Sequence, residues 1–376
     1  MVFLPKPKGY FPPSSRHERG IRNETESTPV GIDFDLLKRL SETPGIASRE
    51  DRVRAVAHEA LQPLVDEIRI DRLGSLVALK RGKGQKRVMI AAHLDEIGFF
   101  VRHIDSNGFL KLQQVGGFDP RTLFAQRVFV HTAKGESLRG VLMPSSKPIH
   151  LLAGEKPAAL RLDEFFVDLG LAGEKVKEMV EVGDMVTLDR TVERVGDQII
   201  GKAMDDRVAV LAMIEAIRRV RSHEVDIYAV ATVQEEVGLR GAGTAAFGVE
   251  PDVGIALDVT LAMDYPGTSE ADMITRLNKG VGITIMDSSV ISDARLVRQV
   301  RTIAERESIA HQVEMLPRGG TDAGAIQRSR AGVPAITLSI PCRYIHTVNE
   351  MVGEGDVEAT ADLLARYLEE AHTLQP

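Results

Sequence analysis

Two adjacent glutamates, Glu235 and Glu236, occupy the position in this chain that most directly suggests chemistry. They follow an apolar run at residues 225–233 that predicts a buried strand, and they precede a predicted helix at 239–247. In α/β folds, ligands bind at the carboxyl ends of such strands. Adjacent carboxylates repel each other unless a positive group lies between them, and a metal ion is the simplest such group. One glutamate could then bind the metal while the other transfers protons; a solvated acidic turn is the alternative.

A histidine and an aspartate, His93 and Asp95, stand in a similar place after the apolar run at residues 88–92. Side chains two residues apart in an extended chain point to the same side. A carboxylate beside a metal-binding histidine can accept its second ring N–H and so fix its tautomer. The pair is therefore a candidate ligand with its orienting group, although a histidine taken alone is more often a surface or packed core residue.

Three further candidates lie where elements are predicted to begin or end. Asp205 begins the predicted helix 206–221, where helix capping is the alternative. Asp258 ends the predicted strand 252–258, where a buried carboxylate is costly without a partner. His346 comes shortly after another predicted strand. All candidates together provide two histidines, two aspartates, a glutamate and a spare glutamate, which suits two zinc-like ions bridged by one carboxylate.

The elements that must position these groups alternate between strand and helix, most clearly after residue 199. Such alternation predicts an α/β fold with a mixed, mostly parallel sheet and helices on both faces. A helix capped by Ser48 is expected to end near Val65. The other predicted helices are 34–40, 206–221, 239–247, 290–307 and 356–372, and the predicted strands are 67–70, 76–80, 88–92, 225–233, 252–258, 281–286 and 334–340.

The pattern changes over residues 102–196, where short alternating runs are separated by glycine and proline turns. Asn107-Gly108 in this stretch is a strong hairpin signal. We expect a small β-rich domain here, inserted into a catalytic α/β domain made of residues 32–101 and 197–376. Residues 1–31 show no periodicity and are expected to form an N-terminal tail, disordered at least in part.

The composition excludes several classes of function. The chain has 376 residues, of which 43% are hydrophobic and 27% charged, and its net charge of −7 gives no reason to expect nucleic acid or membrane partners. The single cysteine, Cys342, excludes a disulfide framework and a zinc–thiolate site within one chain. The basic stretch at residues 80–87 is interpreted as a glycine-containing hairpin turn. No apolar stretch approaches the ~20 residues that span a bilayer, so a cytoplasmic enzyme is expected.

The candidates occur in a specific order, His93-x-Asp95, Asp205-Asp206-Arg207, Glu235-Glu236-Val237-Gly238, Asp258 and His346. This order resembles the tetrahedral (TET) aminopeptidases, the glutamyl aminopeptidase or "endoglucanase M" family of clan MH cocatalytic metallopeptidases. The resemblance runs from about Ile32 to Leu368 and does not include residues 1–31. The stretches that match closely are residues 92–99 (AHLDEIGF), 319–324 (GGTDAG) and 340–346 (IPCRYIH).

This resemblance implies a zinc-peptidase-like fold with two divalent metal ions per chain. Zinc is the first expectation, with cobalt or manganese as alternatives. His93 and Asp258 would hold one ion, Glu236 and His346 the other, and Asp205 would bridge them. In similar enzymes the peptide bond after Asp205 is often strained or cis.

The resemblance also implies a reaction. Glu235 would be the general base and Asp95 would orient His93. A metal-bridging water, deprotonated by Glu235, would attack the scissile carbonyl and release the N-terminal residue of a peptide. The protein would then be a metal-dependent aminopeptidase acting on peptides with a free N-terminus. The acids are thereby explained by metals rather than by glycoside hydrolysis.

The substrate cleft is expected at the glycine-rich stretch formed by Arg318, Gly319, Gly320, Thr321 and Asp322. A simple turn with Asp322 as a helix N-cap is the alternative. Arg318 could pair with an acidic first side chain of the substrate. If it faces solvent or a neighbouring subunit instead, the pocket would take neutral, mainly aliphatic side chains.

Assembly is implied by the resemblance alone. The inserted segment would correspond to the family's dimerisation domain, and six dimers would form a hollow tetrahedral dodecamer that admits unfolded peptides. Two other functions remain open. A dimetal deacylase or amidohydrolase acting on N-acyl amino acids could use the same scaffold. A non-catalytic assembly protein is disfavoured because every ligand and Glu235 are present.

Overall fold

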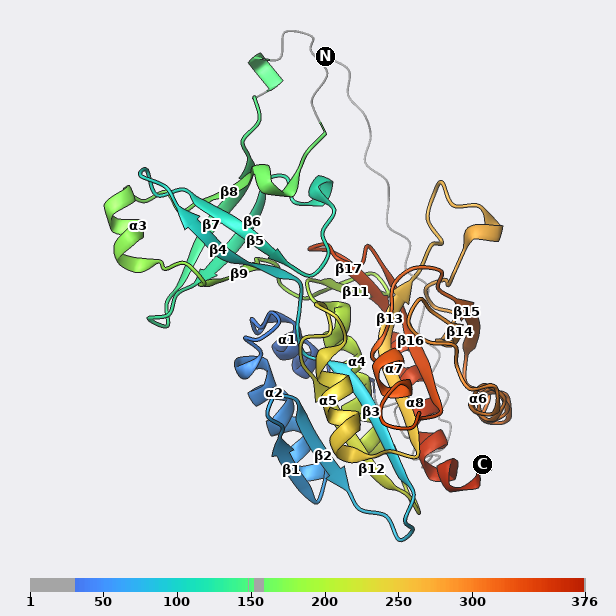
Figure 1. Cartoon of the computed structure of the whole chain (residues 1–376). Helices are drawn as coiled ribbons and strands as arrows, with labels where there is room; N and C mark the ends of the chain where they lie inside the picture. Colours follow the sequence, from blue (N-terminus) through green and yellow to red (C-terminus); the bar gives the residue numbers. More distant parts are fainter. Residues whose placement is uncertain (1–30, 148, 152–158, 375–376) are drawn as a thin grey trace, which may run out of the picture. The chain divides into compact units, whose positions relative to one another are not determined.

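A computed structural model describes residues 31–147, 149–151 and 159–374, and in this part the chain forms a large sheet and a separate barrel (Figure 1). The sheet has eleven strands, and apolar helices pack against both of its faces. The barrel closes from six strands. The predicted fold class, a mixed α/β sheet with helices on both faces and a small β-rich insertion, is confirmed. The predicted tail lies outside the described residues except for Gly31.

Four parallel strands form the centre of the sheet. Their residues are apolar and buried almost throughout, as expected for strands covered on both faces. Parallel pairing brings all four carboxyl ends to one edge of the sheet. In spatial order these strands are β12 (Asp226–Thr232), β3 (Arg87–His93), β13 (Val253–Leu261) and β16 (Ala335–Arg343).

Antiparallel strands extend this centre on both sides. On the side of β12 the sheet continues through β2 and β1, and the predicted hairpin at residues 80–87 is wrong because β12 lies between β2 and β3. On the other side β16 pairs with β17 and β14. The bounds are β1 (Glu67–Ile70), β2 (Leu76–Lys80), β17 (Glu350–Gly353), β11 (Gln198–Gly201), β10 (Glu193–Val195), β14 (Val281–Met286) and β15 (His311–Met315).

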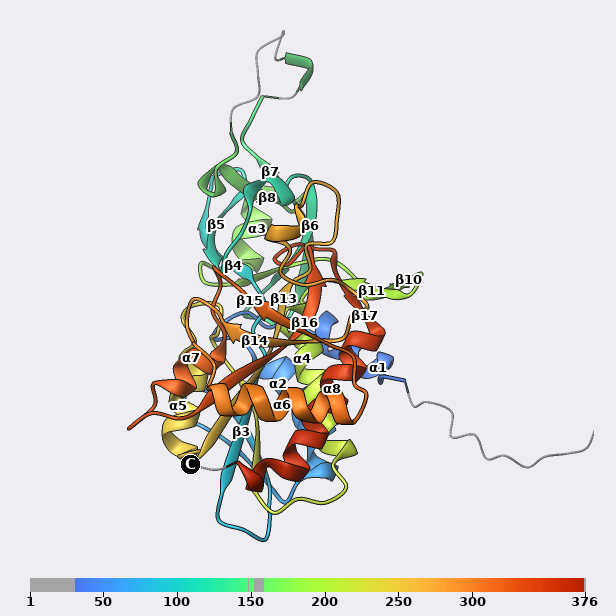
Figure 2. The same cartoon turned by 90° about the vertical axis from the view of Figure 1, so that its right-hand side faces the viewer.

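Alternate residues of each central strand face different helices. In β3, Val88, Ile90 and Ala92 belong to the core under one set of helices, whereas Met89 and Ala91 belong to the core on the opposite face. This follows from the two-residue period of a strand. The first face packs against α1 (Phe34–Glu42), α2 (Asp51–Leu61), α4 (Met204–Arg219), α6 (Ala294–Arg306) and α8 (Glu354–Glu370), and the second against α5 (Arg240–Val249) and α7 (Asp322–Gln327) (Figure 2).

The barrel has an apolar core of its own, made by inward-facing residues of its strands. Gly108 has φ +93 in the turn between β4 and β5, so the predicted hairpin is confirmed. The domain limits and the dimerisation role of residues 102–196 stay predictions. The barrel strands are β4 (Gly98–Ile104), β5 (Leu110–Val115), β8 (Phe165–Asp168), β7 (Ser137–Pro144), β6 (Gln126–His131) and β9 (Met185–Leu188), with α3 (Gly173–Met179) beside them.

Several helix ends differ from the predicted ones because local hydrogen bonds decide them. Ser48 does not cap α2: its φ is +71, and its N–H donates to Glu50, which occupies the N-cap position. The helix expected from residue 290 begins only after Asp293, which caps it. Short 3-10 turns are η1 (Gln62–Leu64), η2 (Pro120–Thr122), η3 (Ile149–Leu151), η4 (Leu162–Glu164), η5 (Glu270–Asp272) and η6 (Ala371–Thr373).

Of the described helices, none is long and apolar enough to cross a membrane.

Candidate metal centre

The carboxyl ends of β3 and β12 bring the first candidates together. His93 is the last residue of β3 and is paired with Thr232, the last residue of β12. The chain then leaves the sheet, and the distance from His93 Nε2 to Glu235 Oε2 is 3.8 Å. Glu236 offers a further carboxylate oxygen to the same group of side chains. Two motifs that are far apart in sequence therefore meet at this edge.

Asp258 reaches the same edge from the middle of a strand. The predicted end of this strand at residue 258 is wrong, because β13 continues to Leu261. Ala256 pairs with Ala91 in the parallel register, so Asp258 lies level with His93. Its side chain is buried, and it can form one group of ligand atoms with His93.

Asp205 enters the site from the start of α4. The N-cap position is held by Ala203, whose φ is +53, so the capping alternative for Asp205 does not hold. The peptide bond between Asp205 and Asp206 is cis, as the family resemblance led us to expect. The fully buried Arg207 anchors this segment by donating to three carbonyl oxygens in residues 40–45.

The two carboxylate oxygens of Asp205 face different histidines. Oδ1 lies 3.0 Å from His93 Nε2, and Oδ2 lies 3.4 Å from His346 Nε2. Glu236 Oε1 is 3.3 Å from the same nitrogen of His346. Asp205 therefore stands between two sets of possible ligands.

Three overlapping groups of side chains have ligand atoms within 4.8 Å of one another. One consists of Asp205, Glu236 and His346, the set expected around the second ion. Around the first ion, His93 and Asp258 are joined by Asp206, whereas Asp205 was expected there. The third group combines His93 with the two glutamates. Each group offers the nitrogen and oxygen ligands that zinc binds in proteins.

Burial and close charges shift the pKa values of these groups strongly. Burial raises the pKa of Asp258 and of Glu235 well above the usual range. For Asp205, burial is outweighed by hydrogen bonds from His346 and His93, which hold its pKa below the usual range. Burial lowers the pKa of His346, but Asp205 and Glu236 together raise it to about 12. A divalent cation among these carboxylates would replace the histidine protons as the positive partner.

The remaining charge imbalance fits divalent metal ions. Asp206 Oδ1 and Asp322 Oδ1 are buried and have no hydrogen-bond partner among the described residues. A buried polar atom left without a partner costs about 1–3 kcal/mol, and more when it is charged. A cation in the group of His93, Asp206 and Asp258 would provide the interaction that Asp206 lacks. The residues present therefore fit the metals that the family resemblance implies.

Asp95 holds the neighbouring segments in two ways. Its backbone carbonyl oxygen lies 2.9 Å from His93 Nδ1, closer than its carboxylate oxygen at 3.6 Å. The carboxylate accepts hydrogen bonds from the backbone N–H groups of Glu235 and Glu236, at 2.9 and 3.1 Å. The contact from the histidine ring thus runs mainly to the carbonyl, and the carboxylate instead fixes the backbone of the two glutamates.

Two residues at the site had no assigned role in the sequence analysis. Asp206 accepts a hydrogen bond from the backbone N–H of His93 at 3.0 Å, and its position next to Asp205 was the available signal. Glu350 contacts the segments of Asp205 and His346, and nothing in the sequence indicated this. Burial, followed by the nearby Asp205 carboxylate, raises the pKa of Glu350 to about 8, and a cation beside Asp205 would oppose that shift.

A cavity of about 670 Å³ opens over these residues. Residues 318–321 of the predicted cleft line it, together with apolar side chains such as Leu261 and Leu316. Asp322 is not part of the lining; it is buried, and its carboxylate accepts from Thr232 Oγ1 at 2.5 Å. The alternative of Asp322 as an N-cap is wrong, because Thr321 holds that position.

The loop after β5 also reaches the cavity. Gly117 and Phe118 belong to its lining. A Cβ atom added to Gly116 would lie 3.1 Å from Glu236 Oε2, and one added to Gly117 would lie 3.3 Å from His346 Nδ1. Side chains at these positions would crowd the candidate ligands. The sequence analysis gave the inserted segment a role in assembly only and missed this contribution, for which the two consecutive glycines were the signal.

Comparison with known proteins places the chain among the aminopeptidases. The lysyl aminopeptidase of Pyrococcus furiosus is 37% identical over 346 residues, covering 90% of this chain and 97% of that protein. The aminopeptidase APDkam598 of Desulfurococcus kamchatkensis superposes with a TM-score of 0.86 at 39% identity, covering 91% and 97% of the two chains. The Pyrococcus horikoshii TET1 peptidase, described as assembling into a tetrahedron or a large octahedral shell, gives 0.80 at 32% identity, covering 90% and 99%.

The particular family follows from residues 74–363, which match the M42 glutamyl aminopeptidases. This protein therefore belongs to the M42 glutamyl aminopeptidase family and is a hydrolase acting on peptide bonds. The resemblance to the TET aminopeptidases stated from the sequence motifs is confirmed.

Proposed function

We propose that this chain is a dimetal aminopeptidase that removes the N-terminal residue from peptides with a free amino end. One observation carries the proposal: the two oxygens of Asp205 face two different histidines, at 3.0 Å for His93 and 3.4 Å for His346. A carboxylate in this position can bind one cation with each oxygen. On this proposal His93 and Asp258 hold one ion, and Glu236 and His346 hold the other.

The ligand set suits zinc first. Imidazole nitrogens and carboxylate oxygens, without a thiolate, are compatible with zinc, cobalt and manganese, so the donors alone do not select one metal. When bound, two such ions would lower the pKa of a water molecule toward neutrality and polarise the scissile carbonyl.

Glu235 is the proposed general base. Its carboxylate is largely buried beside His93, and this burial raises its pKa well above the usual range, which favours a group that accepts and returns a proton. It would take a proton from the attacking water and deliver it to the nitrogen of the leaving amine. Asp95 supports this role by holding the Glu235 backbone N–H at 2.9 Å.

The surplus of carboxylates favours substrates with a free α-amino group. Asp258 and Glu236 lie on the cavity wall close to the proposed ions, and a cationic amine is the complementary group. A panel of aminoacyl-p-nitroanilides and their N-acetylated counterparts tests the proposal. We expect hydrolysis of the free-amino substrates only. Release of acetate from the N-acetylated compounds, without hydrolysis of the free-amino substrates, would instead identify a deacylase.

Arg318 is the proposed determinant of side-chain preference. It is exposed at the rim of the cavity, and within the described residues its guanidinium has no hydrogen-bond or ion-pair partner. The wall near it is apolar, formed in part by Leu261 and Leu316. An aliphatic first side chain could pack on this wall, while an acidic one could also pair with Arg318.

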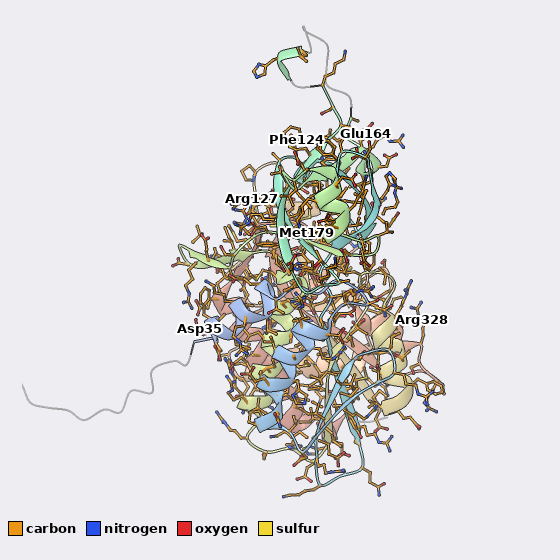
Figure 3. All side chains as sticks on the ribbon, turned by 90° about the vertical axis from the view of Figure 1, so that its left-hand side faces the viewer. Asp35, Phe124, Arg127, Glu164, Met179 and Arg328 are labelled. Carbon is orange, nitrogen blue, oxygen red and sulfur yellow. The ribbon has the colours of Figure 1, made fainter. Side chains whose placement is uncertain are left out.

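Replacing Arg318 by alanine separates these two contributions. An exposed ion pair contributes up to about 1 kcal/mol, so R318A should lower kcat/KM for glutamyl and aspartyl substrates about fivefold. The value for leucyl substrates should stay within about twofold. R328A is the matched control, because Arg328 lies on the surface next to α7 and does not line the cavity (Figure 3). An equal effect of R318A on leucyl and glutamyl substrates would show that Arg318 does not recognise acidic side chains.

We further propose a homo-oligomer, a dodecamer built from dimers, located in the cytoplasm. The family and the described assembly of the TET1 relative support the oligomer. On this chain, Phe124, labelled in Figure 3, is 50% exposed beside the barrel, and Val141 of β7 is 43% exposed. Light scattering on the full chain should give a mass far above that of a dimer. A monomer with full peptidase activity would contradict the proposed hollow dodecamer.

A further inference from the structure

Glu350 joins the two segments that carry the proposed ligands of the second ion. It is the first residue of β17 and only 1% exposed. Its Oε1 accepts from the backbone N–H of His346 at 2.7 Å, and its Oε2 accepts from the backbone N–H of Asp205 at 3.1 Å. One carboxylate therefore connects the segment of His346 to that of Asp205, which lies 145 residues before Glu350 in the sequence.

Both segments have backbone conformations that need support. His346 has φ +63, and Ala203, two residues before Asp205, has φ +53. Residues other than glycine reach this left-handed region at a cost and persist there when surrounding contacts hold them. The two hydrogen bonds to Glu350 are such contacts, and they act on the backbone of the ligand residues themselves.

We propose that Glu350 is a positioning residue that fixes the spacing of Asp205 and His346 and thereby sets the affinity of the second metal position. The inference rests on the two-metal site proposed above. Two backbone N–H groups need two acceptor atoms, which a carboxylate provides and an amide does not. In Glu350→Gln, one N–H therefore faces an NH₂ group, and the spacing of the two ligands is no longer fixed from both sides.

Asp356 offers a matched control elsewhere in the fold. It lies in the first turn of α8, is also 1% exposed, and accepts from the backbone N–H groups of Gly280 and Asn278, both at 2.7 Å. The chemistry is the same, two backbone donors on one buried carboxylate, but these donors belong to no proposed ligand. D356N should therefore lose stability without losing metal.

The experiment measures zinc per chain by elemental analysis after equilibration with graded concentrations of a chelator. Wild-type protein should hold two ions per chain. Loss of a group that orients metal ligands lowers metal affinity about 10–100-fold. E350Q should therefore lose its second ion at a lower chelator concentration than wild type does. It should keep its first ion over the same range. D356N should follow the wild-type curve. The E350D variant, which keeps the charge but is shorter, should fall between wild type and E350Q.

The outcomes are distinct. Wild-type protein that binds fewer than two ions contradicts the proposed function itself. Two ions in the wild type with an unchanged curve for E350Q, or equal losses in E350Q and D356N, would overturn the role of Glu350 alone. If E350Q is insoluble, the E350D curve decides the question by the same criterion, because an unchanged affinity there also contradicts positioning.

Discussion

Glu235→Gln is expected to lower kcat by roughly 10²–10⁴-fold, because the amide cannot accept and return the proton that general-base catalysis requires. The substitution is nearly isosteric. The backbone of residue 235 is held by its N–H bond to Asp95, which does not involve the side chain, so the local conformation should persist. Steady-state kinetics on a leucyl-p-nitroanilide, with zinc content measured on the same sample, check the prediction.

Glu236→Gln is the informative comparison for this variant. Glu236 is a proposed ligand, since its Oε1 lies 3.3 Å from His346 Nε2. E236Q should therefore lose activity together with about one ion per chain, whereas E235Q should keep both ions. If E235Q retains most of its activity, Glu235 is not the base. If it loses its metals, the roles of the two glutamates must be exchanged.

Asp205→Ala is expected to abolish activity and to empty both metal positions. The two oxygens of Asp205 face different histidines, so its removal takes an oxygen from each proposed ion. Bound metal stabilises the folded state by mass action, and this contribution should disappear as well. Elemental analysis and thermal unfolding with and without added zinc would show both effects.

Asp258→Ala provides the control for the bridging role. Asp258 belongs to the group around His93 and to none of the groups around His346. D258A should therefore keep about one ion per chain, and its melting temperature should still respond to zinc. Equal metal content in D205A and D258A would argue against a bridge. Full occupancy in D205A would reduce Asp205 to a structural residue.

Much of the fold could be predicted from the sequence because buried strands appear in it as runs of apolar residues. The run at residues 88–92 is apolar throughout, and β3 is buried on both faces. The alternation of strands and helices indicated a parallel centre, and the short alternating runs between glycine and proline turns indicated a separate β-rich part. Residues 80–87 were predicted as a hairpin turn, but β12 lies between the two strands that they connect, β2 and β3. The sequence of a loop does not show whether another strand inserts between the strands on either side of it.

The candidate site was predictable to the extent that its residues follow strands. His93 comes directly after an apolar run and Glu235 two residues after another, and parallel strands end at one edge. The end of β13 was placed too early, since Asp258 was taken as a terminator although it lies inside the strand. A charged residue inside a buried strand contradicts the local pattern, and such conflicts are typical of functional sites.

The supporting contacts were not predictable, because they join distant segments through backbone groups. Glu350 bonds to the N–H groups of Asp205 and His346, and any residue in either segment carries an N–H, so no side-chain pattern marks the partner. Asp95 illustrates the same point. Its two-residue spacing from His93 indicated the side on which it lies, but not that its carboxylate holds the glutamate backbone instead.

The central claim, a two-metal aminopeptidase, is tested most directly by titrating metal-free protein with zinc while following hydrolysis of leucyl-p-nitroanilide and of its N-acetyl derivative. We predict that hydrolysis of the free-amino substrate rises until two zinc ions are bound per chain, and that the acetylated substrate is not cleaved at any point. Saturation of activity at one ion per chain, activity that needs no metal, or cleavage of the acetylated substrate alone would contradict the account.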